Sequence, residues 1–154
     1  MSVEIINLGK SRIDETVKII GNGKITLGNN VQLRAYTVIE IDGMLNISEN
    51  SVLGYHSFIQ CSGTMHIGKG TLIGPNTVLL ASSHKITEVP LIKETIERSH
   101  LTIKDNVWIG ANCTINNGII IYDNAIIAAN SFVNKDVESN SIVGGTPAKL
   151  IRHR

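Results

Sequence analysis

The sequence predicts an all-β protein built as a solenoid of stacked parallel coils with a triangular cross-section. Three observations predict this fold class: an aliphatic residue recurs at every sixth position, glycines recur in register with it, and strand and turn formers dominate the composition. The chain holds 25 Ile, 11 Val, 15 Asn and 14 Gly, but only 4% aromatic residues. A β-rich chain this poor in aromatic residues favours a repeat of small coils over an ordinary sandwich.

The first part of the repeat has a coil of twenty residues, in which two steps of six are followed by one step of eight. Gly23, Gly43 and Gly63 stand at the same place within the long step, where each is expected to form a bulged corner. The aliphatic positions are Ile13, Ile19, Leu27, Leu33, Ile39, Ile47, Leu53, Ile59, Ile67, Ile73 and Leu79.

The second part of the repeat has a strict coil of eighteen residues, at Ile103, Ile109, Ile115, Ile121, Ile127 and Val133. Four residues after each aliphatic position the chain carries mostly small or β-branched side chains, as a narrow interior requires. These are Thr37, Ser51, Ser57, Thr71, Thr77, Cys113, Ala125 and Ser131. Short strands of about two residues on each of three sides, joined by Asn- and Gly-bearing corners, would complete each coil.

A loop of about eighteen residues, 85–102, interrupts the repeat between Leu79 and Ile103. Its sequence KITEVPLIKETIERSHLT combines the aliphatic residues Ile86, Val89, Leu91, Ile92 and Ile96 with six charges, which is typical of a segment that docks on another surface. A neighbouring subunit is the natural partner, and an ordinary solvated loop is the alternative. Weak helical patterns occur only near residues 93–98 and after Pro147, in a short C-terminal tail.

Composition excludes several classes of protein. The 14 basic and 13 acidic residues give a formal charge of +1, so nothing indicates a nucleic-acid or membrane-surface binder. No apolar run is long enough for membrane insertion, and the N-terminus does not resemble a secretory signal. We therefore expect one cytoplasmic domain over residues 1–154. Cys61 and Cys113 form neither a disulfide framework nor a zinc motif, so both are expected to be reduced thiols.

His84 is the candidate catalytic residue, because it coincides with the break in the repeat. An imidazole exposed there could take a proton from an attacking hydroxyl or amine. A surface or capping histidine is the alternative, since other histidines are scattered through the chain. The spacing of His56, His66 and His84 does not bring metal ligands together, so no metal is expected. Ser82 and Ser83 lack the surroundings of a serine nucleophile.

The two cysteines are poor candidates for an acyl carrier. Cys113 is expected at an inward, small-residue position, and Cys61 at an outward position far from His84 in sequence.

Two segments carry a resemblance to a known family. The run IKDNVWIGANCTI, residues 103–115, and the run NKDVESNSIVGGTPAKLIR, residues 134–152, resemble the hexapeptide-repeat acetyltransferases. The similarity is greatest to the maltose and galactoside acetyltransferase-like branch, which includes bacterial polysaccharide O-acetyltransferases. It implies a left-handed parallel β-helix, a homotrimer, acetyl-coenzyme A as the donor, and His84 as the catalytic histidine preceding the VWIG motif.

The same resemblance implies a set of donor-binding residues. Trp108 matches the tryptophan beside the pantetheine arm, and Ala111 matches the position whose backbone N–H faces the thioester carbonyl. Positions along the coenzyme channel and near its phosphates are matched by Ala129, Asn134, Lys135, Lys149 and Arg152. Three departures, Asn134 for threonine, IAAN at 127–130 for IGAG and Asn117 for proline, alter the channel's shape. The chain also begins almost directly with the repeat, without the helical segment that helps form the sugar pocket of the galactoside enzymes, which leaves the acceptor open.

The expected function is direct transfer of an acetyl group to a sugar hydroxyl, in the synthesis of a bacterial surface polysaccharide. Acetylation of an amino sugar, free or nucleotide-linked, is the alternative that uses the same donor geometry. A non-catalytic solenoid is a third possibility, but the outward positions are mixed: Arg34, Glu40, Gln60 and Lys69 form no regular row of one residue type.

Overall fold

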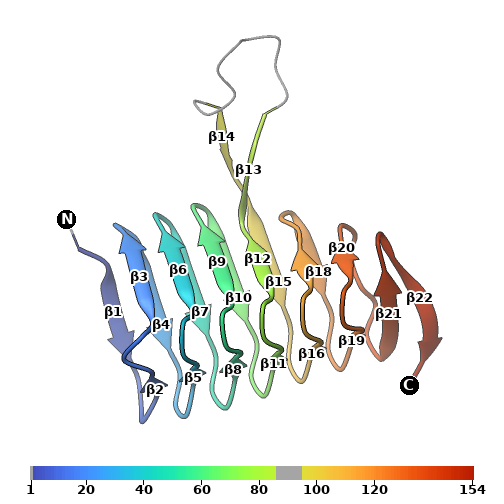
Figure 1. Ribbon diagram of the computed structural model, residues 1–154, viewed down its shortest axis with the longest axis horizontal. Helices are drawn as coiled ribbons and strands as arrows, with labels where there is room; N and C mark the ends of the chain where they lie inside the picture. The colour runs from blue at the N-terminus through green and yellow to red at the C-terminus, as the bar shows by residue number, and fades with distance from the viewer. Residues whose placement is uncertain (1, 86–94) are drawn as a thin grey trace.

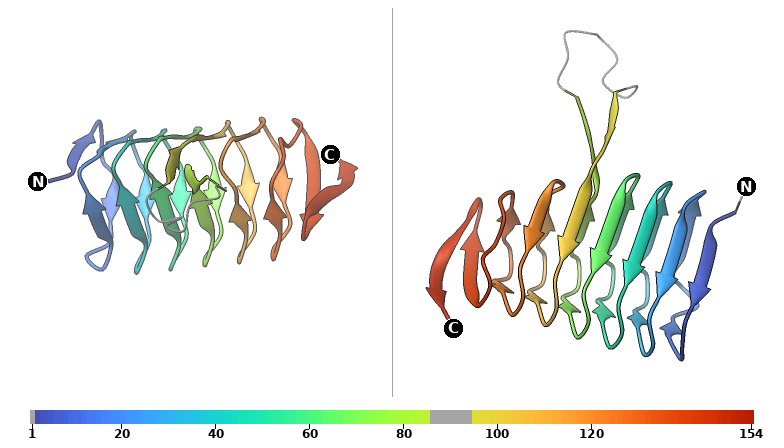
Figure 2. Two further views of the ribbon diagram at one scale, coloured as in Figure 1. Left: turned by 90° about the horizontal axis from the view of Figure 1, so that it is seen from above. Right: turned by 180° about the vertical axis from the view of Figure 1, so that it is seen from behind.

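The computed structural model describes residues 2–85 and 95–154, which coil into three parallel sheets around a narrow core (Figure 1). The strands pair with their equivalents one coil away, and Figure 2 shows the coils following one another along the long axis. Sheet A holds β1 (Glu4–Asn7), β4 (Lys24–Leu27), β7 (Met44–Ile47), β10 (Thr64–Ile67), β15 (His100–Ile103) and β18 (Ile119–Ile121). No helix occurs in the described ranges.

The other two sheets complete the triangle. Sheet B holds β2 (Arg12–Ile13), β5 (Gln32–Leu33), β8 (Val52–Leu53), β11 (Leu72–Ile73), β16 (Trp108–Ile109), β19 (Ile126–Ile127), β21 (Ser141–Gly145) and β22 (Ala148–His153). Sheet C holds β3 (Lys18–Gly21), β6 (Val38–Ile41), β9 (Phe58–Cys61), β12 (Val78–Leu80), β17 (Thr114–Ile115) and β20 (Phe132–Val133). We name the turns between sheets the A–B, B–C and C–A corners, in the order in which the chain passes them.

The predicted aliphatic ladder forms the core. Every predicted position from Leu27 to Val133 is buried. Ile13 and Ile19 are exceptions, because they belong to the first coil at one end of the solenoid; Ile13 is 41% exposed and Ile19 is partly buried. The predicted small residues also all point inward. Hydroxyl groups among them form hydrogen bonds to the backbone of the next coil. Thr37 donates to the carbonyl oxygen of Gly54 at 3.1 Å, and Ser51 donates to that of Gly68 at 2.7 Å. In the described part of the chain no buried side-chain nitrogen or oxygen lacks a partner.

Longer strands than expected change two assignments. Strands of sheets A and C run to four residues in the first half of the solenoid, so inward residues alternate along them. Cys61 therefore follows Ile59 into the interior and is fully buried, which corrects its predicted outward position. The segment after Pro147 is also not helical: β22 pairs antiparallel with β21 and ends sheet B.

The interruption of the repeat begins and ends earlier than the predicted limits of 85–102. β13 (Ser82–His84) and β14 (Ile96–Arg98) form an antiparallel ribbon that projects from the solenoid at the C–A corner (Figures 1 and 2). The ladder resumes at β15, where Thr102 pairs with His66. The described end of the segment with helical pattern, residues 95–98, is extended rather than helical, and half of the predicted docking segment, residues 86–94, lies outside the described residues.

Replacing Gly43 by alanine should destabilise the protein by about 2 kcal/mol, because a new Cβ would collide with the carbonyl oxygen of Gly63 in the next coil. That oxygen accepts the Met44 N–H at 2.9 Å, so it cannot move away without loosening the ladder. Urea denaturation measures the change. Thr64→Ala, at an exposed position of sheet A directly after the corner glycine Gly63, is the matched control, and equal stability of the two variants would contradict the explanation.

Candidate active site

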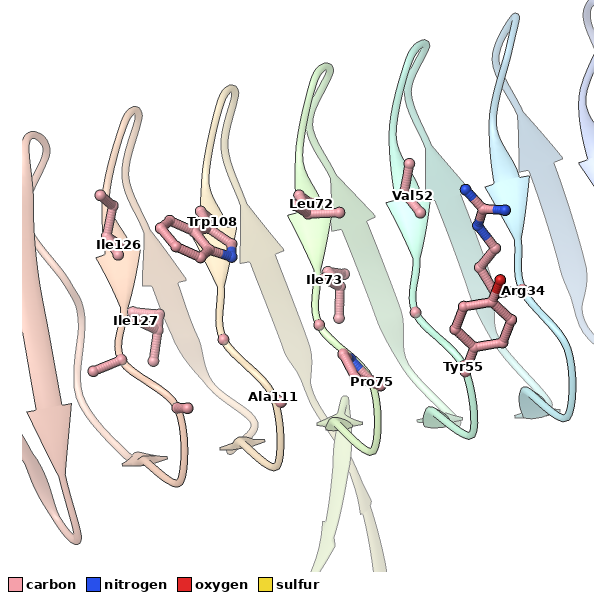
Figure 3. A pocket seen from close by; sticks show the side chains of 15 residues that line it. Arg34, Val52, Tyr55, Leu72, Ile73, Pro75, Trp108, Ala111, Ile126 and Ile127 are labelled. Carbon is pink, nitrogen blue, oxygen red and sulfur yellow. The ribbon is translucent and has the colours of Figure 1, made fainter.

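A groove runs along the outer surface of sheet B beside the B–C corners of successive coils (Figure 3). Its volume is about 550 Å³. The wall consists of outward side chains in ladder register, among them Val52, Leu72 and Trp108. Trp108 is 52% exposed and so presents much of its ring to a ligand. The groove is apolar along most of its length, as suits an extended organic chain.

The floor of the groove is nearly bare backbone. Gly54, Gly74 and Gly110 occupy one row of the corners, because a Cβ at any of them would press into the backbone of the next coil. The next row contains Pro75, Ala111 and Ala129. Ala111 follows Trp108 by three residues in the same coil, and both line the groove.

The Ala111 N–H donates to no acceptor among the described residues. Its neighbours do have partners: Gly110 donates to the oxygen of Ile127 at 2.8 Å and Asn112 to that of Pro75 at 2.9 Å. An unpaired N–H that lines a groove is a ready donor to an oxyanion. The N–H groups of Tyr55 and Ala129, at the same corner of other coils, are equally unpaired within the described chain.

A second, smaller cavity of about 250 Å³ lies toward the C-terminal end of the solenoid. Asn134 and Lys135 line it from the corner after β20, and Lys149 lines it from β22. The structure thus brings three of the predicted donor-binding residues together here and three others, Trp108, Ala111 and Ala129, in the groove. Arg152 lines neither; it is exposed on β22, where its Nη1 donates to the backbone oxygen of His153 at 3.1 Å.

His84 is exposed on the projecting ribbon, where it pairs with Ile96. The ribbon departs from the C–A corner, after Ala81, whereas the groove follows sheet B and the B–C corner. His84 is accordingly not among the residues that line the groove of its own chain. Its role as the catalytic base stays a prediction. In that role it would act at the groove of its own chain or of a neighbouring chain.

The far end of the groove was missed by the sequence reasoning. Tyr55 and Arg34 close it opposite the Ile127 end (Figure 3). A signal was present: Tyr55 occupies the corner position that other coils give to Ala35, Pro75, Ala111 and Ala129.

Comparison with known proteins agrees with this geometry. A family model described as bacterial transferase hexapeptide (six repeats) matches residues 100–135. The galactoside O-acetyltransferase of Escherichia coli K12 is 29% identical over 142 residues, which cover 92% of this chain and 70% of that enzyme. The chain carries the hexapeptide repeat and is similar in sequence to acetyltransferases. Four further curated relatives align over segments that cover only 25% to 40% of their own lengths.

Two solved structures place this acetyltransferase within its fold. A maltose O-acetyltransferase from Clostridium difficile 630 superposes with a TM-score of 0.68 at 25% identity, covering 97% of this chain and 70% of the other. A variant of AntD, an N-acyltransferase from Bacillus cereus in complex with dTDP-4-amino-4,6-dideoxyglucose and coenzyme A, superposes with a TM-score of 0.85 at 20% identity, covering 96% and 83%. The left-handed parallel β-helix implied by the resemblance is thereby confirmed.

The thiols and acidic groups of this acetyltransferase offer little further chemistry. Both cysteines are free and buried, and burial raises the pKa of Cys61 to about 11 and also raises that of Cys113. The described residues contain no group of three or more histidine, cysteine or acidic side chains that could hold a metal ion, and no helix that could span a membrane.

Neither cysteine should react with Ellman's reagent in the folded protein. At pH 8 the fraction of Cys61 thiolate is about one in a thousand, from its pKa of about 11, and both sulfurs are shielded by the core. The colour change at 412 nm should appear only when guanidinium unfolds the chain. Rapid labelling of a native thiol would reopen the possibility of a cysteine acyl carrier, and Cys61→Ala would identify which thiol reacted.

Proposed function

We propose that this enzyme transfers the acetyl group of acetyl-coenzyme A directly to a hydroxyl of a sugar. The observation that carries the proposal is the unpaired N–H of Ala111, a residue that lines an apolar groove together with the exposed Trp108. This is a site for a thioester whose carbonyl must accept negative charge. The galactoside and maltose O-acetyltransferase relatives support a sugar as the acceptor.

The donor would lie along the solenoid. Its pantetheine arm would pass Trp108 and Ala129 in the groove, and its phosphates would reach the C-terminal end, where Asp136 and Glu138 line the smaller cavity together with two lysines. Lys135 and Lys149 share the cavity there with Asn134, and Arg152 lies exposed on the adjacent strand. Lysine and arginine side chains suit phosphate, which they bind by charge-assisted hydrogen bonds. No metal is required in this scheme.

The reaction would need one base and one oxyanion donor. The His84 imidazole takes the proton of the acceptor hydroxyl while that oxygen forms a bond with the thioester carbonyl carbon. The Ala111 N–H stabilises the tetrahedral oxyanion, an effect worth roughly 3 to 4 kcal/mol. The carbon–sulfur bond then breaks, and the thiolate of coenzyme A leaves and takes the proton back from the imidazolium. The products are an acetylated sugar and free coenzyme A.

This scheme needs two copies of the chain at each site. His84 stands on the ribbon at the C–A corner, while the groove lies along sheet B. We therefore propose a homotrimer in which the ribbon of one subunit brings His84 to the groove of its neighbour. Ile96, 59% exposed beside His84, supports a ribbon whose natural environment is a protein surface.

The location, the domain organisation and the product of the enzyme are part of the same proposal. We place the enzyme in the cytoplasm, as one domain over residues 1–154, with its product in a surface polysaccharide such as capsule, O-antigen or exopolysaccharide. No role for nucleic acid or membrane insertion enters the scheme. Acetylation of an amino sugar is the alternative reaction, and acceptors that differ only by hydroxyl or amine distinguish the two.

Replacing His84 by alanine should lower acetyl transfer about 10²-fold or more. The change in the free energy of unfolding should be only about 0.5 kcal/mol, since the side chain is exposed. The measurement is thioester cleavage from acetyl-coenzyme A with a panel of sugars and amino sugars. His66→Ala, on the outer face of sheet A, is the control. If the His84 variant retains more than about a tenth of wild-type turnover on any productive acceptor, the base assignment fails.

Replacing Ala111 by proline should remove the oxyanion donor without disturbing the coil, because Pro75 already occupies the equivalent corner one coil away. Turnover should fall about 10²-fold. Ala111→Gly, which keeps the N–H, is the matched control and should remain active.

Co-expression of His84→Ala and Ala111→Pro chains then tests the shared site. Mixed trimers in which half the subunits carry each change should recover about a quarter of wild-type activity, because one interface in four pairs two intact groups. A chain carrying both changes is the control. Mixed with either single variant, it should give no activity above the residual rate of that single variant. Failure of the two single variants to complement would place His84 and Ala111 in the same subunit's site.

A further inference from the structure

Four exposed side chains gather where the groove ends, in the first half of the solenoid. The Tyr36 and His56 rings are stacked, with centroids 4.9 Å apart and an interplanar angle of 13°. The guanidinium carbon of Arg34 lies 5.7 Å from the centroid of the Tyr55 ring. We call Arg34, Tyr36, Tyr55 and His56 the aromatic cluster. It concentrates two of the chain's three tyrosines on one surface.

The cluster has no evident role in stability. Tyr36 and Tyr55 are 57% and 50% exposed, and the solenoid core closes beneath them without their help. Tyr36 also adopts a left-handed backbone, with φ of 62°, at a corner position where later coils have Asn76, Asn112 and Asn130. Asparagine tolerates that conformation well, whereas a bulky residue does so at a cost. A residue that breaks a local rule without stabilising the core points to function.

The aromatic cluster is continuous with the proposed reaction site. Arg34 and Tyr55 line the same groove as Trp108 and Ala111. Ala111, Pro75 and Tyr55 are equivalent residues of successive coils, so Tyr55 lies two coil spacings, roughly 10 Å, from the oxyanion donor. A ligand that reaches both must extend well past the ring whose hydroxyl reacts.

The chemistry of the intervening surface selects the kind of ligand. Between Ala111 and Tyr55 the groove is lined by Val52, Leu72 and Pro75, and it carries no charged side chain until Arg34. A diphosphate laid along this stretch would lose its hydration with no cation or donor to replace it. A sugar suits it better, because its C–H face can lie on an apolar or aromatic surface while its hydroxyls face outward. Arg34 then offers planar N–H donors to hydroxyl or carboxylate oxygens at the end of the groove.

We propose that the aromatic cluster is a second sugar-binding subsite, so that the acceptor is an oligosaccharide or polysaccharide rather than a single sugar. This inference rests on the proposed acetyl transfer to sugars. The reacting ring occupies the groove near Ala111, and a neighbouring ring of the same acceptor stacks on Tyr36 or Tyr55. Tyr36, Tyr55 and Arg34 thus determine specificity and take no part in moving the proton or the acetyl group.

The fold offers conservative variants for testing the subsite. Tyr55→Ala introduces alanine, which already occupies the equivalent corner position in two other coils, at Ala35 and Ala111. Tyr36→Asn introduces asparagine, which the later coils have at that position. The double variant should therefore fold normally. Tyr122→Ala is the control, since Tyr122 is also exposed, at 40%, but lies on the A–B corner.

The first measurement is binding to the full-length protein without coenzyme A, by saturation-transfer NMR. The probes are maltose, maltotetraose, β-1,4-galactobiose and β-1,4-galactotetraose, with dTDP as a nucleotide probe. At least one tetrasaccharide should bind the wild type and the Tyr122 variant, and bind the double variant about tenfold more weakly. Absence of tetrasaccharide binding to the wild type overturns the proposal. So does dTDP binding that the double variant loses, which would make the cluster a nucleotide subsite.

The second measurement is kcat/KM for acetyl transfer to glucose, galactose and their tetrasaccharides. For a productive series, the wild type and the Tyr122 variant should show about a tenfold gain from single sugar to tetrasaccharide, mainly in KM, and the double variant should lose that gain. Transfer to single sugars without any gain from length overturns the subsite and leaves the proposed function standing. If no sugar is acetylated, the proposed function fails, and the binding measurement alone decides whether the cluster holds a saccharide.

Discussion

The whole structure depends on the parallel, in-register pairing of each coil with the next. Strands of all three sheets pair with the equivalent strands of the next coil. Backbone hydrogen bonds, such as that from the Met44 N–H to the oxygen of Gly63, also join the corners of adjacent coils. This pairing holds coils about 4.8 Å apart. At the tightest corners the spacing leaves no room for a Cβ, as the contacts around Gly43 and Gly63 demonstrate.

The groove is a direct product of that constraint. Because Gly54, Gly74 and Gly110 must be bare where the coils approach, a channel opens beside the outward side chains of sheet B. The ladder then aligns Val52, Leu72, Trp108 and Ile126 as its wall. The stacking of the coils alone thus produces a narrow binding groove, and a few larger side chains are enough to close its end. Arg34 and Tyr55 do so at one end.

Most of the fold could be predicted from the sequence, since a period of six places a single side-chain type inside the coil. The burial of Leu27 through Val133 and of the Ser and Thr row depends on that period alone. Strand length was harder to predict, because residues beside a corner can continue a strand or turn, and this is why Cys61 was misplaced. The limits of the ribbon were also missed, by three residues at its start and four at its end, because its strands pair only with each other and do not follow the repeat.

The site was predictable only in parts, for a related reason. Trp108, Ala111 and Ala129 were identified through a resemblance, and the structure brings them into one groove. Tyr55 and Tyr36 belong to no family motif in the sequence, and their meaning depends on which residues occupy the same corner in other coils. That comparison requires the register of the stacked coils, which the structure supplies. The relation that we propose between His84 and the groove involves a neighbouring chain, so the sequence and structure of one subunit do not contain it.

The row of unpaired corner N–H groups has a consequence for how such a protein acquires an active site. Tyr55 and Ala129 present the same free donor as Ala111, because every coil turns the corner in the same way. A solenoid of this kind therefore carries several equivalent N–H groups that could bind an oxyanion, and none of them is catalytic by itself. In the trimer that we propose, the coil from which the ribbon departs would determine which of these N–H groups faces the base. Moving that departure point by one coil would then relocate the reaction along the molecule without altering any residue of the corner.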